Sequence, residues 1–214
     1  MQLIFKQIVD TNNIIYDRAI SIYNNSFPEN EKQLVSVIKN RIDEAKSHLF
    51  VGILKTKVVC MALLWEFNNS EFILLEYLAV KENQRNKNYG SKILNFIIDK
   101  VKINNKYLII EVENYLFGNN IEQRKKRINF YIKNGAYILN NVPYLIPSLN
   151  NTLATETLLM LAPKYHKLYL KKHEVDELIR RLYVELYQKS ENDKMLNSIL
   201  EKITDKINLT NNII

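Results

Sequence analysis

The chain has 214 residues, of which 47% are hydrophobic and 25% are charged. These values fit one domain of ordinary size with a buried core, and they exclude a disordered or fibrous chain. A single cysteine, Cys60, excludes a disulfide framework and a cysteine-based metal site. Thirty Lys and Arg against 23 Asp and Glu give a net charge of +7, which indicates either a polyanionic partner or a solvated basic surface.

No apolar run approaches the ~20 residues that a membrane span requires, and the first ten residues become polar too early for a secretory signal. We therefore expect a cytoplasmic protein without a membrane partner. Neither a helix-turn-helix, nor a zinc motif, nor an RNP motif is present, so we expect no nucleic-acid partner. The three histidines share no metal-like spacing, and we expect no bound metal.

Hydrophobic spacing in the first half predicts a strand followed by two amphipathic helices and an antiparallel meander. Asp10 and Thr11 are predicted to cap the first helix. The predicted elements are a strand at 3–8, helices at about 12–24 and up to about 44, and strands at 48–54, 58–67 and 71–80.

The second half alternates further strands and helices around a polar loop at 81–88. The predicted helices span about 90–101 and 121–134, and the predicted strands span 107–113, 136–139 and 155–161. After Pro163 the pattern becomes that of two amphipathic helices, at His173–Lys189 and Met195–Ile207, before a tail at 208–214 that we expect to fray.

This change of pattern predicts a domain at 1–164 and a C-terminal helical extension at 165–214. A stripe of Leu and Ile on both extension helices is compatible with three arrangements. The helices could pack back on the sheet, cover a binding cleft, or form the interface of a homodimer.

The most informative segment is Gln84–Ser91, which leaves a predicted strand and opens a helix. It carries two cations, an Asn that tolerates a left-handed backbone, and Gly90 at the helix start. Backbone N–H groups and the helix dipole would converge there on an anion such as a diphosphate. The segment matches neither a Walker loop nor GxGxxG, and a plain capped helix remains the alternative.

Three motifs resemble those of the Gcn5-related N-acetyltransferases, over about residues 1–162. The segment Leu74–Leu94 resembles their acetyl-CoA motif, with Asn88 at the position of its first glycine and Arg85 and Gly90 at the other marked positions. Two weaker matches are Arg127–Ala136, similar to F-Y-x-x-x-G, and Ser26–Glu31, similar to S-F-P-x-x-E.

This resemblance implies an α/β fold of the α+β type, with a mixed, mostly antiparallel central sheet flanked by helices. It implies acetyl-CoA as the acyl donor, a bulge in the fourth strand, and pantetheine that hydrogen-bonds along this strand. Alternation along the strand would place Glu76 on one face and Tyr77 on the other. The implied cofactor-binding residues are Leu78, Ala79, Val80, Arg85, Asn86, Lys87, Asn88, Tyr89, Gly90 and Ser91.

Acetyl transfer to an amine needs a proton acceptor, a donor to the thioester oxygen and an acid for the thiolate. We expect Glu76 as the base, with Glu111 and Glu113 as rivals, although any of them could instead attract or pair with a cation. The resemblance nominates Tyr131 as the acid, and a main-chain N–H near Leu78 as the oxygen donor.

The predicted acceptor is a primary amine on a small molecule or a protein. Phe27, Glu31, Glu111 and Glu113 are its candidate contacts, and their acidity would suit a cationic amine. The alternative function is that of a non-catalytic acyl-CoA-binding regulator on the same fold. The basic run Arg124–Arg127 could contact the donor's phosphates or be solvated.

Overall fold

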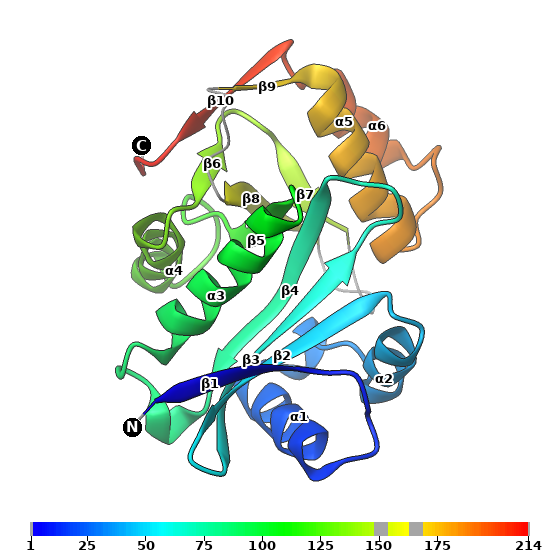
Figure 1. The fold of residues 1–214 in the computed structure, drawn as a ribbon. Helices are drawn as coiled ribbons and strands as arrows, with labels where there is room; N and C mark the ends of the chain where they lie inside the picture. Colours follow the sequence, from blue (N-terminus) through cyan, green and yellow to red (C-terminus); the bar gives the residue numbers. More distant parts are fainter. Residues whose placement is uncertain (1, 148–153, 163–168, 214) are drawn as a thin grey trace. The chain divides into compact units, whose positions relative to one another are not determined.

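The computed structural model describes residues 2–147, 154–162 and 169–213. The chain divides into two compact units, Met1–Lys106 and Tyr107–Ile214. Figure 1 shows the elements of both units along the chain. Each unit combines helices with strands, and all strand pairs described below are antiparallel. The predicted fold class is thus confirmed.

The sheet of the first unit has the order β1-β2-β3-β4. Its strands are β1 (Leu3–Ile8), β2 (Ser47–Leu54), β3 (Lys57–Glu66) and β4 (Phe72–Val80). Its helices are α1 (Ile14–Ser26), α2 (Val35–Asp43) and α3 (Tyr89–Ile103), with short 3₁₀ turns at η1 (Glu29–Glu31) and η2 (Glu82–Gln84). The predicted meander is confirmed, but Asn13 caps α1 in place of Asp10 and Thr11.

Helices cover both faces of this sheet (Figure 1). On one face, α1 and α2 bury a core that includes Ile38, Met61 and Tyr77. On the other face, α3 brings Phe96 against the ring of Phe50, with the two ring centroids 5.9 Å apart. Successive residues of β2 point to opposite layers, and Phe50 and Val51 are both buried, as expected of a strand that is covered on both faces.

A β-bulge interrupts the pairing of β3 with β4. Leu63 lies opposite Tyr77 and Leu64 lies opposite Leu75, so Glu76 is the extra residue of β4. This bulge confirms the expectation from the family motif. It also makes the predicted alternation wrong at this point, because the extra residue breaks the period of two. Glu76 and Tyr77 both contact the layer of α1, α2 and η1.

The second unit has the strand order β5-β8-β6-β10-β9, with β7 also paired to β8. Its strands are β5 (Tyr107–Glu113), β6 (Tyr137–Leu139), β7 (Tyr144–Ile146), β8 (Thr155–Ala162), β9 (Tyr169–Lys171) and β10 (Lys206–Thr210). Its helices are α4 (Ile121–Lys133), α5 (Lys172–Arg181), continued by the π-helical turn η3 (Leu182–Leu186), and α6 (Lys194–Glu201).

The C-terminal segment differs from the prediction in three places. The helix expected at Met195–Ile207 ends at Glu201, and Ile207 lies in β10 instead. Residues 208–210 of the tail belong to the same strand, which pairs with β6 and β9. The helix expected up to Lys189 ends in η3 at Leu186. Strand pairing overrides helical spacing here, and Ile207 is buried within β10. The boundary at 164 remains a prediction.

Candidate functional site

The loop between β4 and α3 uses two asparagines in the left-handed region. Asn86 has φ of 61° and Asn88 has φ of 62°. The latter is the N-cap of α3, and the first helical hydrogen bond runs from Lys92 N–H to its carbonyl at 3.1 Å. The N–H groups of the first helical turn, Tyr89 to Ser91, precede that bond and are available to an anion.

Two cations lie on this loop at the protein surface. The Arg85 Nε donates to the Val80 carbonyl at 3.5 Å, and the Lys87 Nζ donates to Gln84 Oε1 at 3.1 Å. Both side chains are exposed and bind no carboxylate in the described structure. Exposed cations beside the start of a 15-residue helix make this loop suited to an anionic group.

Leu78, Ala79 and Val80 connect the bulge to this loop. Their partners in β3 are Ala62, Met61 and Cys60. The predicted cofactor-binding residues of this unit therefore form one continuous run of strand, loop and helix. This continuity depends on local sequence, which explains why the pattern could be recognised without a structure.

The carboxylate of Glu76 forms an ion pair with Arg41 of α2. The Arg41 Nη1 to Glu76 Oε1 distance is 3.1 Å, and the two side chains are 10% and 8% exposed. The guanidinium also lies over the ring of Trp65, at 4.6 Å from its centroid. The ion pair thus fixes Glu76 and compensates its charge. Sequence reasoning missed Arg41, although its position three residues after Ile38 places it on the buried face of α2.

Phe27 and Glu31 lie next to Tyr77, the residue after the bulge. The Phe27 ring is 4.9 Å from that of Tyr77, and the Tyr77 hydroxyl donates to the main-chain carbonyl of Glu31 at 2.9 Å. Burial raises the pKa of Tyr77 far above its usual value, so its hydroxyl stays protonated. The Glu31 side chain is exposed, and the half-buried Phe27 packs in this aromatic cluster.

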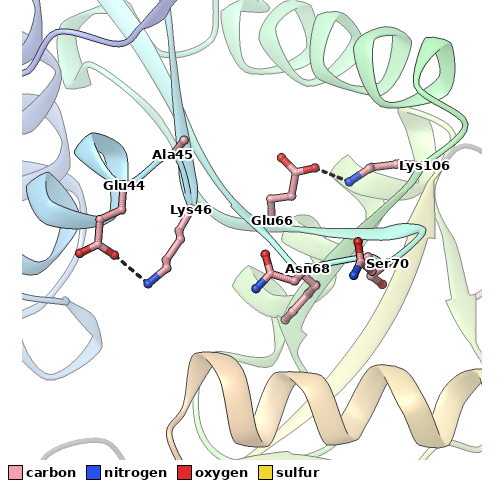
Figure 2. Close-up of a pocket in the computed structure, with 9 residues that line it drawn as sticks. Glu44, Ala45, Lys46, Glu66, Asn68, Ser70 and Lys106 are labelled. Carbon is pink, nitrogen blue, oxygen red and sulfur yellow. Dashed lines mark hydrogen bonds and ion pairs between the residues drawn. The ribbon is translucent and has the colours of Figure 1, made fainter.

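Figure 2 shows a polar pocket of about 630 Å³ in the same unit. Its lining residues are Glu44, Ala45, Lys46, Glu66, Phe67, Asn68, Asn69, Ser70 and Lys106. Its charged groups pair with one another, Lys46 with Glu44 at 2.7 Å and Lys106 with Glu66. None of the predicted site residues lines this pocket.

In the second unit, two tyrosine hydroxyls bind the carboxylate of Glu111 in β5. Tyr144 of β7 donates to Oε1, and Tyr187, which follows η3, donates to Oε2 at 2.7 Å. Burial raises the pKa of Glu111 to about 6, although both hydroxyls favour the charged form. This carboxylate can therefore gain or lose a proton near neutral pH. Neither tyrosine was singled out from the sequence.

Glu113 lies on the same face of β5 as Glu111, as its spacing predicted. It forms two ion pairs with α4, to Arg124 at 2.9 Å and to Arg127 at 3.0 Å. A third cation of the basic run, Lys125, lies over the Tyr115 ring at 5.3 Å from its centroid. Most of the run therefore has partners within this unit.

Tyr131 lies near the end of α4 and is half-buried, with its ring 5.1 Å from that of Phe130. Burial raises the pKa of its hydroxyl to about 12, while the charge of Arg127 acts in the opposite direction. The phenol is thus fully protonated at neutral pH, which is the state that an acid for a thiolate requires.

Among the residues described, no group of three or more His, Cys, Asp or Glu side chains could hold a metal ion. The helices in the described ranges all lack the combination of length and hydrophobicity needed to cross a membrane.

Comparison with known proteins gives one family match. Residues 45–135 match the model of the acetyltransferase (GNAT) domain. This range contains the bulge, the loop with its left-handed asparagines, and the Phe130–Tyr131 pair. No curated protein matches the sequence significantly.

Solved structures share the fold at low sequence identity. A GNAT-family protein from Bacteroides thetaiotaomicron is 22% identical, with a TM-score of 0.72 and coverage of 87% of this chain and 99% of its own. An aminoglycoside 6'-N-acetyltransferase in complex with coenzyme A is 15% identical, with a TM-score of 0.54 and coverage of 76% and 99%.

The ribosomal-protein-S18-alanine N-acetyltransferase of Escherichia coli is 16% identical, with a TM-score of 0.52 and coverage of 79% and 100%. At these identities the structures establish the fold alone. The domain match adds to this likeness of fold: residues 45–135 are similar to the acetyltransferase (GNAT) domain, in agreement with the motifs identified in the sequence.

Proposed function

We propose that the protein is an N-acetyltransferase that moves the acetyl group of acetyl-CoA to a primary amine by direct attack. The observation that carries this proposal is the bulged strand β4 leading into a loop with two left-handed asparagines at the start of α3. Two structures that share the fold are named as N-acetyltransferases, and one of them is a complex with coenzyme A.

The donor would be held by two parts of the first unit. N–H groups of Tyr89 to Ser91, with Arg85 and Lys87, would bind its diphosphate. The backbone of Leu78 to Val80 would pair with pantetheine as an added strand does. A main-chain N–H near the bulge would stabilise the charge that develops on the thioester oxygen.

The reaction requires two proton transfers. The neutral amine forms a bond to the thioester carbon, the carbon–sulfur bond breaks, and the amine's excess proton passes to a carboxylate. Tyr131 donates its phenolic proton to the departing thiolate; burial raises its pKa to about 12, so the hydroxyl carries that proton at neutral pH.

Two carboxylates are candidates for the base. Glu76, the base expected from the sequence, is held in an ion pair by Arg41. Glu111 has hydroxyl partners instead of a cation and a pKa of about 6, close to the pH at which a base must work. These observations favour Glu111 as the proton acceptor. Glu76 would then orient the acceptor together with Arg41.

The acceptor would be an amine on a small molecule or a protein. Not all of the acidic residues expected near the acceptor can attract a cationic amine, because Arg41 pairs with Glu76 and two arginines pair with Glu113. Charge therefore contributes less to acceptor binding than the sequence suggested. Contacts from the aromatic cluster of Phe27 and Tyr77 would contribute more.

The test is a release assay for free thiol with acetyl-CoA and a panel of amines, joined to thermal unfolding with acetyl-CoA. We expect a rise in melting temperature at micromolar acetyl-CoA and thiol release with at least one amine. Stabilisation without thiol release over a broad panel would favour the acyl-CoA-binding regulator. No stabilisation up to millimolar acetyl-CoA would contradict both functions.

A further inference from the structure

The C-terminal segment reaches back to a strand that lies 76 residues earlier in the chain. Tyr187, just after η3, donates its hydroxyl proton to Glu111 Oε2 at 2.7 Å. Tyr144 of β7 donates to the other oxygen, Oε1. Each carboxylate oxygen therefore has its own hydroxyl donor, and both donors lie beyond the family-model match, which ends at residue 135.

Neighbouring contacts hold the two donors in place. The Tyr183 hydroxyl donates to the carbonyl of Leu145 in β7 at 2.6 Å, which ties η3 to the strand that carries Tyr144. The Tyr183 ring centroid lies 6.3 Å from that of Tyr144 and 6.5 Å from that of Tyr187. Three tyrosines and their three hydrogen bonds thus set the orientation of the Glu111 carboxylate.

The described contacts of the Glu111 carboxylate include no cationic side chain. On its own strand, Glu113 is bound by Arg124 and Arg127. From β7 and from the end of η3, the groups that face it are the hydroxyls of Tyr144 and Tyr187. A base held by neutral donors keeps its affinity for a proton better than one held by a cation.

We propose that Tyr187 is a positioning residue for Glu111, and that the C-terminal segment is thereby a working part of the acetyl-transfer machinery. The inference rests on the proposed function, because it assigns Glu111 the task of accepting the amine's proton. Tyr187 supplies a hydrogen bond that fixes the carboxylate and favours its charged form. Without this hydrogen bond, the Glu111 carboxyl would be less well oriented and harder to deprotonate.

The first measurement follows the Glu111 carboxyl itself, without any substrate. Protein labelled with ¹³C at the glutamate side-chain carboxyl is titrated by NMR, and the signal is assigned by its loss in Glu111→Gln. We expect Tyr187→Phe to raise the midpoint by about one pH unit, since a donor to the charged form is removed. Tyr169→Phe is the control, because Tyr169 is an exposed residue of β9 and lies outside the tyrosine cluster that holds Glu111.

The second measurement is the pH profile of kcat/KM for thiol release with an amine that the panel identifies. In Tyr187→Phe the acid limb should move to higher pH by the same amount as the NMR midpoint. Tyr169→Phe should leave the acid limb where it is in the unsubstituted protein. If Tyr187→Phe does not fold, as judged by circular dichroism, then Tyr144→Phe removes the other donor and takes its place.

The outcomes separate the inference from the proposed function. A moved NMR midpoint with an unmoved acid limb would show that the hydroxyl only satisfies a buried carboxylate, and would overturn the inference. An unmoved midpoint would overturn it as well. Absence of thiol release with every amine would contradict the proposed function and the catalytic part of the inference together, while the NMR titration would still decide whether Tyr187 holds the carboxylate.

Discussion

Arg41 binds Glu76 at the point where β4 gains its extra residue. The Nη1 to Oε1 distance is 3.1 Å, and the bulge is what directs the Glu76 carboxylate toward α2. A buried carboxylate and a buried guanidinium each lose hydration, and their mutual attraction helps to offset that cost. The pair therefore links the helix layer to the irregular part of the strand.

We expect Arg41→Gln to reduce the free energy of unfolding by about 3–5 kcal/mol, since it removes the cation that pairs with the buried Glu76 carboxylate. The double variant Arg41→Gln with Glu76→Gln should recover part of that loss. Urea unfolding of the two single variants and the double variant measures the coupling. Lys39→Gln, in an exposed pair with Asp43 on the same helix, is the control and should cost less than about 1 kcal/mol.

Tyr131→Phe should lower kcat by about 100-fold, because the thiolate would depart without an acid. The dissociation constant for acetyl-CoA should stay the same, since the proton is needed only when the carbon–sulfur bond breaks. Steady-state kinetics and calorimetric titration give the two values. Tyr169→Phe, at a 39% exposed position in β9, is the control. An unchanged kcat in Tyr131→Phe would remove Tyr131 from the role of acid.

Asn88→Val should weaken acetyl-CoA binding by about tenfold, because a β-branched residue resists the left-handed conformation at the start of α3. Asn88→Gly should bind about as well as the unsubstituted protein, since glycine adopts that conformation freely. Asn105→Val introduces the same strain beyond the far end of α3, where φ is 54°. It should cost stability but not affinity, and equal loss of affinity in both valine variants would refute the assignment.

Gly52→Ala should destabilise the first unit by about 1–3 kcal/mol, a typical cost of overpacking. A Cβ at residue 52 would lie 2.5 Å from the Sγ of Cys60, which is the partner of Gly52 across the β2–β3 pair. Thermal unfolding measures the loss. Adding Cys60→Ala to the same chain removes the sulfur and should restore most of the stability; a double variant no better than Gly52→Ala would place the clash elsewhere.

The raised pKa of Glu111 makes stability depend on pH. Its value of about 6 in the folded chain exceeds the usual 4.5, so the folded state binds this proton more tightly than the unfolded state. Its contribution to stability is therefore complete below about pH 4.5 and is lost as the pH rises past 6. Glu111→Gln should then be more stable than the unsubstituted protein at pH 8, by up to about 2 kcal/mol. Urea unfolding at pH 4.5 and pH 8 checks the difference.

Local sequence was sufficient for the elements whose residues carry their own signal. The strands at Leu3–Ile8 and Tyr107–Glu113 have the bounds that hydrophobic spacing predicted. The left-handed Asn88 followed from its residue type and its place before a helix. The bulge followed from the family motif that surrounds it.

Contacts between distant residues could not be predicted in the same way. Arg41 and Glu76 are 35 residues apart, and Tyr187 and Glu111 are 76 apart, so no local period relates the two partners. The short strands β7, β9 and β10 were missed for a related reason. They contain three to five residues each, and strand pairing with other parts of the chain determines their conformation.

The bulge at Glu76 has a consequence for chain length. With this one residue deleted, Leu75 would still face Leu64 and Tyr77 would still face Leu63, so the ladder would run without interruption. The pairing of β3 with β4 therefore does not require Glu76. A chain of 213 residues could keep the same strand partners, but it would remove the carboxylate that pairs with Arg41 and would straighten β4 before the loop that leads to α3.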